Sequence, residues 1–551
     1  MKKLLIAIFI FALLVVGTIG YSQAVRVPYF MSRYTLVAWN DLGMHCMDRD
    51  FSVFAILPPY NNLHAQLSDR FTGKLITSNV TITYEATKDT TGSINSTSIG
   101  KTNFWDWVKS LFGVSPSPDM GLAGNPVQNM IPAKMSYDSV NGYWKAEGIP
   151  ATPYNDSGNA NYYPMVKVVA KDRYGNIIAT TKTVLPVSDE ITCVHCHASG
   201  TGDPMAQPSP DWVYDPDQGK DWKRNILLLH DNKNIDNATF QQALDKHGYS
   251  AAGLLATADS GKPILCASCH SSNALGTAGF AGVKPLTEAI HSWHGTNAMD
   301  DNTGMPMDQT TDRSVCYYCH PGSTTQCLRG VMGTAKDTSG NLLLQCQSCH
   351  GSMSKVGTPG RKGWVDLPKC QNCHYWSDTT NSYVRDTSVF DVEGNFRQAA
   401  SIFTTETKLY KVAAGAGGHG NMQCEACHGS THAEYTTSEA NDNVQSSLIQ
   451  GHPGTIVECS ACHALTLTVT SNGGPHGLHT IGQMWVFMHG QYAKKDISHC
   501  NQCHGSTLGG TSLSKTFVTR IVWSYDGYKS FPHGHAVGCA DCHYGRWKLK
   551  K

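Results

Sequence analysis

Cysteine and histidine recur in this sequence as a five-residue unit, Cys-x-x-Cys-His, which is present nine times. The two thiols of a unit lie on one side of a helical turn, and the histidine follows directly. This spacing is typical of a covalently attached c-type haem, whose vinyl groups bond to the thiols and whose iron binds the histidine. The cysteines concerned are Cys193, Cys196, Cys266, Cys269, Cys316, Cys319, Cys346, Cys349, Cys370, Cys373, Cys424, Cys427, Cys459, Cys462, Cys500, Cys503, Cys539 and Cys542.

Disulfides and zinc sites account less well for these cysteines. A disulfide scaffold gives no reason for a histidine after every second cysteine. Zinc ribbons use two Cys-x-x-Cys pairs for each ion, and nine units cannot be divided into pairs. The predicted cofactors are therefore nine covalently attached haem c groups. The proximal iron ligands are then His197, His270, His320, His350, His374, His428, His463, His504 and His543.

The spacing of the units predicts how the haems are arranged. About forty residues are available for each haem between positions 193 and 543. That is too little protein to enclose each haem separately, so neighbouring haems must share walls and lie close together. The units that begin at 346 and 370 are the closest in sequence, and we expect their haems to be adjacent.

The chain also has enough histidines to fill the opposite side of every iron. Sixteen of the 25 remain after the proximal ligands are assigned. A second histidine gives a low potential, methionine raises it, and an empty site permits catalysis. Methionine at one or two irons stays open, and any single histidine could instead have a surface or hydrogen-bonding role. The predicted distal ligands are His230, His291, His294, His419, His432, His452, His476, His479 and His489; the reserves are His45, His64, His195, His247, His499, His533 and His535.

His195 differs from the other reserves because it lies inside the unit CVHCH at 193–197. It precedes His197 by two residues, which places it about 200° around a helix. It therefore cannot bind the same iron as His197. Either it reaches a neighbouring haem or it is exposed to solvent.

Composition and charge restrict the class of protein. The chain has 551 residues, and 43 basic and 43 acidic side chains give it no net charge, which argues against a nucleic-acid partner. Each haem adds negative charge through its propionates, so the loaded protein is predicted to be acidic.

No Cys-x-x-Cys unit ends in lysine in place of histidine, so no open, substrate-binding iron is required.

The first residues resemble an export signal. Residues 1–24 combine Lys2 and Lys3, an apolar run, and small residues at Ser22 and Ala24 that suit a leader peptidase. The alternative is a retained membrane anchor, although the apolar run is short for a span. No later stretch is apolar enough to cross a bilayer. We expect an exported protein without a transmembrane segment after cleavage, in the periplasm or on the outer cell surface.

The mature chain divides near residue 190. Residues 25–190 contain none of the Cys-x-x-Cys-His motifs, which we call haem units. Strand patterns at 80–86 and 165–185 predict an all-β, sandwich-like domain there. The stretch 104–113 is predicted as a short amphipathic helix or aromatic loop that packs in the core. Residues 191–551 are predicted to form a nine-haem domain, mostly irregular with short helices. The clearest helices are 221–234 and 237–251, the second with Asn237 as its cap.

Two cysteines lie outside the haem units, Cys46 and Cys327. In an oxidising compartment they could join the two domains through a disulfide. Their separation in sequence carries no geometric information, so two separate thiols are an equal alternative.

From residue 221 onward the chain resembles the large multihaem c-type cytochromes of Geobacter-like metal-reducing bacteria. The resemblance lies in RNILLLHD, GKPILCASCHSSNALG, PLTEAIHSWH, CEACHGSTHAEY, GHPGTIVECSACH and GGPHGLHTIGQMWV, and in the front segment NDLGMHCMDRDFSVFAILPPYNNLHAQ and PVSDE. It implies bis-histidine haems and periplasmic or outer-surface electron transfer, as in anaerobic respiration. The partners it implies are other redox proteins, such as cytochromes, and extracellular acceptors such as metal oxides.

Three functions compete for this sequence. We favour an electron-transfer protein that is not an enzyme and turns over no substrate. An enzyme would instead use one haem to reduce a small oxyanion such as nitrite, hydroxylamine or tetrathionate. A third alternative is a polymerising filament subunit, because some proteins of the family it resembles form haem-lined polymers.

Overall fold

The computed structural model describes residues 32–360, apart from 323 and 338, and then shorter segments. These are 370–377, 382–385, 388–389, 422–464, 482–495, 497, 500, 504–505, 507–510, 514, 516, 519–524, 526–532 and 534–543. The predicted signal peptide, residues 1–24, lies outside the described residues. Within the described residues, no helix is long and apolar enough to cross a membrane.

The first antiparallel sheet has the strand order β1-β4-β9-β8, and β5 pairs with the end of β4. Strand β4 is central, and all seven of its residues are buried. Its register with β1 places Leu67 opposite Leu36 and Ala65 opposite Ala38. The bounds of these strands are β1 Tyr34–Asn40, β4 Leu63–Asp69, β5 Lys74–Ile76, β8 Ser136–Asp138 and β9 Tyr143–Ala146.

The second antiparallel sheet has the order β11-β10-β6-β7 and contains the strands that the sequence predicts. Asp172 closes the β10–β11 hairpin because its carboxylate accepts hydrogen bonds from the backbone N–H groups of Tyr174 and Asn176, both at 2.9 Å. The strand predictions at 80–86 and 165–185 are thus confirmed. The bounds are β6 Val80–Thr87, β7 Ala133–Lys134, β10 Met165–Asp172 and β11 Ile177–Val184.

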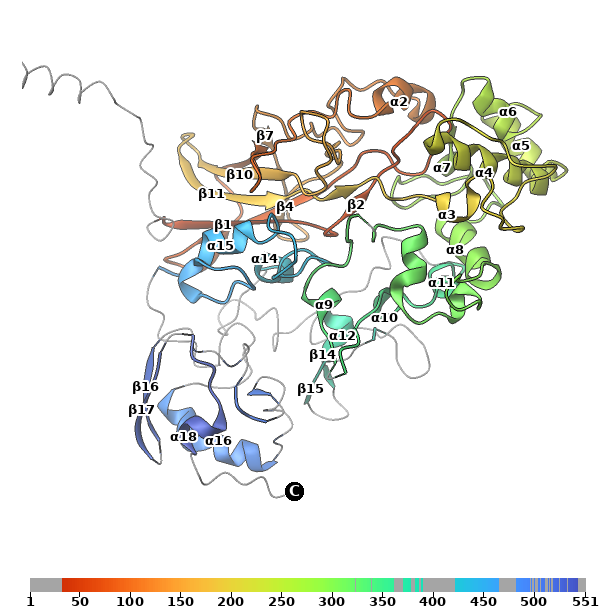
Figure 1. The fold of residues 1–551 in the computed structure, drawn as a ribbon. Coiled ribbons are helices and arrows are strands. Elements are labelled where there is room, and N and C mark those ends of the chain that lie inside the picture. The colour runs from red at the N-terminus through yellow and green to blue at the C-terminus, as the bar shows by residue number, and fades with distance from the viewer. Residues whose placement is uncertain are drawn as a thin grey trace, which may run out of the picture.

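The inner faces of the two sheets share one hydrophobic core. Alternate residues of β10, namely Val166, Val168 and Ala170, point into it, because successive side chains of a strand face opposite sides. Leu36 and Leu63 enter the same core from the first sheet. The two sheets therefore lie face to face, as Figure 1 shows for the red to yellow part of the ribbon.

Helix α2, Phe104–Phe112, confirms the amphipathic helix predicted at 104–113. Phe104, Val108 and Leu111 are its buried side chains, and their spacing of four and three residues places them on one face. The helix ends at Gly113, whose φ of 69° is the left-handed conformation that glycine adopts without strain.

Most of the regular structure in the haem-unit region is helical, and loops and turns connect the helices. Asn237 caps α5 as predicted, since its side chain accepts hydrogen bonds from Thr239 N and Phe240 N. The described helices are α3 Val194–His197, α4 Gln218–Asn234, α5 Ala238–Lys246, α6 Leu254–Asp259, α7 Cys266–Cys269, α8 Leu286–Asn297, α9 Val331–Thr334, α10 Cys346–His350, α11 Met353–Val356, α12 Cys370–Cys373, α14 Cys424–His428, α15 Val444–Gln450, α16 Gln483–Lys495 and α18 Cys539–Cys542. The 3-10 turns are η2 Met307–Gln309, η3 Arg313–Tyr318 and η5 Cys459–Ala461.

Short strands connect or extend these parts. Strand β2 (His45–Cys46) pairs in parallel with β12 (Val187–Ser188), and β3 (Phe54–Ala55) pairs in parallel with β13 (Ile264–Leu265). Strand β13 directly precedes Cys266, so the second haem unit begins after a strand that pairs with the front part of the chain, residues 32–190. Two hairpins complete the described strands: β14 His374–Ser377 with β15 Ser382–Arg385, and β16 Arg520–Ser524 with β17 Gly527–Phe531.

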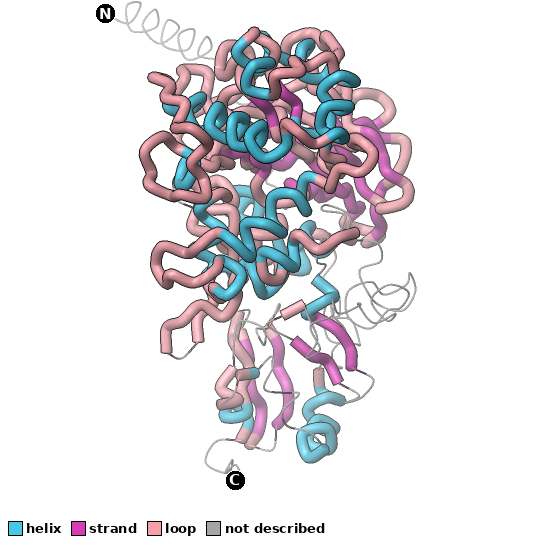
Figure 2. Tube along the Cα trace, turned by 90° about the vertical axis from the view of Figure 1, so that its right-hand side faces the viewer, coloured by secondary structure: helices cyan, strands magenta, loops and turns pink. Residues whose placement is uncertain are grey.

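Hydrophobic clusters cross the predicted domain boundary near residue 190. Val53 and Phe54 pack with Trp222 and Leu227 of α4, and Phe51 packs in a cluster that includes Leu265. The β-rich part therefore serves as a support for the haem units. Figure 2 shows its strands partly covered by helices and loops, and Figure 1 shows the hairpin of β16 and β17 at the opposite end of the molecule.

A buried glutamine attaches α15 to the edge strand β1. The side-chain amide of Gln445 donates to Ala38 O at 2.7 Å and accepts from Ala38 N at 2.8 Å. It also accepts from the hydroxyl of Thr181 at 3.0 Å, and it lies 3.0 Å from the hydroxyl of Tyr435. The amide thus pairs with both backbone groups of Ala38, as a neighbouring strand would.

We expect Gln445→Leu to lower the free energy of unfolding by about 2–4 kcal/mol, because it leaves two buried backbone groups without partners. Urea unfolding followed by circular dichroism measures the change. The matched control is Gln242→Leu on the exposed face of α5, with an expected change within about 0.5 kcal/mol. Equal effects of the two substitutions would contradict this role for Gln445.

Candidate haem sites

Each described haem unit folds into a single helical turn. The backbone N–H of the closing histidine donates to the carbonyl of the first cysteine, for example from His197 to Cys193 at 3.0 Å and from His270 to Cys266 at 3.0 Å. The same bond joins His543 to Cys539 at 2.9 Å. Residues three and four positions apart are neighbours on a helical turn, so both thiols and the histidine lie on one side of it.

Five of the predicted proximal histidines each face a predicted distal histidine. The ring centroids of these pairs lie between 5.7 and 6.4 Å apart. In one pair, His489 and His543, the two Nε2 atoms are 3.5 Å apart. The pairs are His197 with His294, His270 with His230, His320 with His291, His350 with His432, and His543 with His489.

In four of these pairs the separation of 6.2–6.4 Å matches two imidazoles on opposite sides of one metal ion, and the fifth pair, His489 with His543, is closer at 5.7 Å. Metal–imidazole bonds are about 2 Å long and a ring centroid lies about 1.2 Å behind its nitrogen, so the centroids of opposite ligands are about 6 to 6.5 Å apart. The angle between ring planes varies from 15° for His291 and His320 to 89° for His230 and His270. Ordinary aromatic pairs also span about 4.5 to 7 Å. What distinguishes these pairs is that each joins one predicted proximal ligand to one predicted distal ligand.

Hydrogen bonds fix which ring nitrogen carries the proton in six histidines. A carbonyl oxygen only accepts, so a ring nitrogen bonded to it carries a proton, and in the neutral imidazole the other nitrogen has the lone pair. Nδ1 lies 2.6–2.9 Å from a carbonyl in each of these histidines. They are His270 (Lys284 O), His291 (Thr287 O), His294 (Ile290 O), His432 (Leu42 O), His489 (Val486 O) and His504 (Val537 O).

Burial keeps several of these imidazoles neutral. Burial first, and then the charge of the facing histidine, lowers the pKa of His197, His230 and His320 to about 4. Only a neutral imidazole binds a metal, so these rings are ready to act as ligands at neutral pH.

The donor set fits a bis-histidine haem c. Each pair supplies two opposite nitrogens, and the thiols of the same unit lie on one side of the turn. Within the described parts of the chain, no three or more His, Cys, Asp or Glu side chains gather as a set of metal ligands. Two facing histidine nitrogens are the donors that a bis-histidine haem iron takes from a protein.

The other predicted ligands are placed as follows. The ring of His463 lies against Gly73, where an added Cβ would be only 3.0 Å from Cε1 of the histidine. The carbonyl of His428 accepts from Tyr435 N at 2.7 Å, and His452 is exposed with Nε2 at 3.4 Å from Glu458. The remaining predicted atoms lie outside the described residues or side chains: those of His374, His419, His476, His479, Cys459 and Cys503.

The described reserve histidines have other partners. Three lie against carboxylates: His45 with Asp41 at 2.6 Å, His195 with Asp301 at 2.9 Å, and His535 with Asp541 at 3.0 Å. His64 stacks on Tyr143 at 4.3 Å, and His247 lies 5.8 Å from Tyr249. His499 and His533 lie outside the described residues.

His195 also stacks on Tyr318, the second of the two tyrosines between the cysteines of the unit CYYCH. The ring centroids are 4.0 Å apart and the planes differ by 13°. Tyr318 is a contact that the sequence analysis missed, because no periodicity relates positions so far apart in the chain. This stack joins the first and third haem units.

Thiols of further units lie close enough to change one another's pKa. In two cases the main cause is a hydrogen bond that the thiol donates to its neighbour: Cys316 donates to Cys346 and Cys370 donates to Cys424, which raises the pKa of Cys316 and of Cys370. Burial and then the charge of a neighbouring thiol raise the pKa of three others: Cys349 next to Cys373 and Cys427 next to Cys462, each to about 12, and Cys539 next to Cys500. The units beginning at 346 and 370, predicted to be adjacent, are among these neighbours.

Cys46 and Cys327 are near each other and are both thiols in the structure. Burial raises the pKa of Cys46, and the charges of Cys327 and Glu190 raise it further. Burial lowers the pKa of His432, but Cys327 and the carbonyl of Leu42 outweigh burial and raise it to about 9. The pair thus lies beside a predicted distal ligand.

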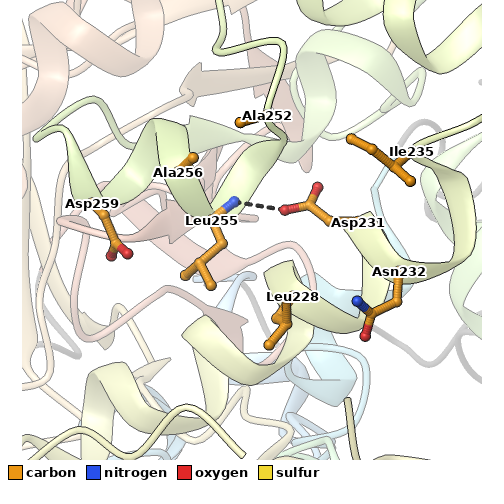
Figure 3. Close-up of a pocket in the computed structure, with 8 residues that line it drawn as sticks. All are labelled: Leu228, Asp231, Asn232, Ile235, Ala252, Leu255, Ala256 and Asp259. Carbon is orange, nitrogen blue, oxygen red and sulfur yellow. Dashed lines mark hydrogen bonds between the residues drawn. The ribbon is translucent and has the colours of Figure 1, made fainter. Parts of the chain in front are cut away.

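A surface pocket of about 320 Å³ lies between α4 and α6 (Figure 3). Its central polar group, Asp231, accepts hydrogen bonds from Leu254 N at 2.8 Å and Leu255 N at 2.9 Å. The carboxylate therefore caps the start of α6. The lining has no histidine or cysteine and is separate from the haem units.

No protein-family model matches the sequence, and no curated protein or solved structure is significantly similar to it.

Proposed function

We propose that the chain is an exported multihaem c-type cytochrome that relays electrons through closely spaced bis-histidine haems. The observation that carries the proposal is the set of five facing histidine pairs at 5.7–6.4 Å. Bound haem supplies reversible one-electron chemistry at its iron. The chain's thiols would attach it, and the facing imidazoles would hold its iron. An iron closed on both sides exchanges electrons without binding a substrate.

Neighbouring units support transfer between haems. The proposal is supported by pairs of units whose thiols shift one another's pKa: 316 and 346, 346 and 370, 370 and 424, 424 and 459, and 500 and 539. We propose redox proteins and extracellular acceptors, such as metal oxides, as the partners, and the periplasm or outer cell surface as the location.

The test is the haem content and spin state of the exported full-length protein. We expect nine haems per chain by pyridine haemochrome assay, and low-spin ferric signals by electron paramagnetic resonance (EPR). We expect eight haems when Cys346 and Cys349 are both replaced by alanine. The double variant Cys46→Ala/Cys327→Ala, in the two cysteines outside the units, is the control and should keep nine.

Carbon monoxide binding decides between the relay and the enzyme. Bis-histidine haems leave no free position, so the reduced protein should not bind carbon monoxide. Binding at one haem, with a high-spin ferric signal, would favour reduction of a small oxyanion and contradict the relay as the sole function. Regular filaments in electron micrographs of the secreted protein would instead indicate the polymer.

A further inference from the structure

We infer that the haem unit CVHCH (193–197) lies between the units CASCH (266–270) and CYYCH (316–320), and that the His195–Tyr318 stack joins it to CYYCH. The spatial order of these haems is then second, first, third, which differs from their order in the sequence. The inference rests on the proposed function and adds the path that electrons take through this part of the protein.

Helix α8 connects the first and third units. His291 faces His320, with ring centroids 6.2 Å apart, and His294 faces His197 at 6.3 Å. The two histidines are three residues apart on one helix, and such side chains are neighbours, about 5–6 Å apart at Cβ. One short helix thus supplies the facing histidine to both units, and their haems must be adjacent.

The units themselves are also in contact. The ring of His195 lies on the ring of Tyr318 at 4.0 Å, and the N–H of Thr192 donates to Cys319 O at 3.2 Å. Two adjacent carboxylates hold the stack. Asp301 lies 2.9 Å from His195 Nε2, and Asp300 accepts from the Tyr318 hydroxyl at 2.8 Å. His195 is therefore a positioning residue between two units.

Helix α4 connects the first and second units in a similar way. Its His230 faces His270 with centroids 6.4 Å apart. On the same helix, the buried side chain of Asn225 donates to His197 O at 3.0 Å. Cys193 and Cys266 pack against one hydrophobic cluster. This cluster includes Phe54 from the front part of the chain and Trp222 from α4. In Figure 1, α3 accordingly lies between α7 and α8.

This order has a functional consequence. Haems held at His270, His197 and His320 would supply one-electron chemistry, and an electron that enters at the unit of Cys266 and Cys269 would reach the unit of His197 before that of His320. Each transfer would oxidise one iron and reduce the next, so it would need no proton or further reactant. The unit at 266 is therefore an end of this part of the path, although the unit at 193 comes first in the chain.

The direct test locates the irons by anomalous X-ray scattering in crystals of the loaded full-length protein. We expect the iron at His197 to be the nearest neighbour of the irons at both His270 and His320. A shorter distance between the irons at His270 and His320 than from either to the iron at His197 would overturn the inference. Absence of iron from these positions would overturn the proposed function instead.

A kinetic test uses a photoreducing ruthenium label on Asn273→Cys, an exposed position three residues after His270. In this background, His294→Met raises the potential of the haem at His197 and makes it a trap. We expect the electron to stop at the methionine-ligated haem, with at least a tenfold loss of the signal that reaches the haem at His320. Undiminished arrival at His320 would show that the unit at 266 contacts the unit at 316 directly.

The role of the stack is tested by two substitutions at one position. His195→Ala removes the ring and should weaken the exciton coupling of neighbouring haems in the Soret circular dichroism. His195→Phe keeps a ring for the stack and should restore that coupling, although it loses the contact with Asp301. Both variants should retain nine haems. Equal coupling in the alanine and phenylalanine variants would contradict the inference that the His195–Tyr318 stack joins the two haem units.

Discussion

Replacing Arg329 by methionine is expected to lower the free energy of unfolding by about 3–5 kcal/mol, because it leaves a buried carboxylate without its counter-charge. The Arg329 side chain is fully buried. Its guanidinium binds both oxygens of Asp442, at 2.6 and 2.8 Å, and donates to Gly43 O at 2.6 Å. One residue thus connects the front part of the chain to the segment between the sixth and seventh haem units.

Two further variants separate lost charge from lost packing. Arg329→Met combined with Asp442→Leu removes both charges, and replacing a buried pair with apolar side chains is often neutral or stabilising. We therefore expect the double variant to recover most of the stability. Urea unfolding of the loaded protein, followed by far-ultraviolet circular dichroism, gives the comparison. A double variant no more stable than Arg329→Met would contradict the unpaired carboxylate as the cause.

The control is an exposed ion pair of the same type. Arg33 lies 2.7 Å from Asp69, but its side chain is 58% exposed. Exposed pairs contribute up to about 1 kcal/mol. Arg33→Met should therefore change the unfolding free energy by no more than that.

Lys223→Met is expected to have an effect of similar size, about 3–5 kcal/mol, at the junction between α4 and the front part of the chain. The ammonium group donates to Asp48 at 2.7 Å, to Asp50 O at 2.7 Å and to Phe54 O at 2.9 Å. The side chains of Lys223 and Asp48 are 2% and 1% exposed. Removal of the lysine leaves the carboxylate of Asp48 buried and without its cation.

The change at Lys223 should also reach a haem. Helix α4 carries His230, which faces His270, so movement of the helix alters the axial ligation of the second unit. We expect the EPR signal of one low-spin haem to shift or become high-spin in Lys223→Met. Lys220→Met, on the same helix but only partly buried, is the control and should change neither stability by more than about 1 kcal/mol nor the spectrum. An unaltered haem spectrum in a destabilised Lys223→Met would show that α4 does not position His230.

Much of the local structure was predictable because it depends on neighbouring residues. The alternation of apolar side chains predicted β10 and β11, and the spacing of Phe104, Val108 and Leu111 predicted α2. Asn237 was recognisable as a cap for the same reason. The burial of Lys223 and Arg329 was not predictable, since each pairs with a carboxylate more than a hundred residues away.

The predictions about the haems divide in the same way. The attachment positions come from a spacing of three and four residues, which one helical turn converts directly into two thiols and a histidine on one side. The pairing of the histidines depends on contacts between distant segments. His197 faces His294 and His350 faces His432, and no pattern in the sequence relates these positions.

His195 illustrates the difference between the two levels. Helical geometry alone excluded it as a ligand of the iron that His197 is predicted to bind. Only the packing of α8 and η3 placed Tyr318 against its ring and Asp301 against its Nε2. Local spacing therefore determines where cofactors can be attached, because a helical turn is built from consecutive residues. The order of the haems in space is decided by tertiary contacts, because helices such as α4 and α8 bring together units that the chain itself keeps apart.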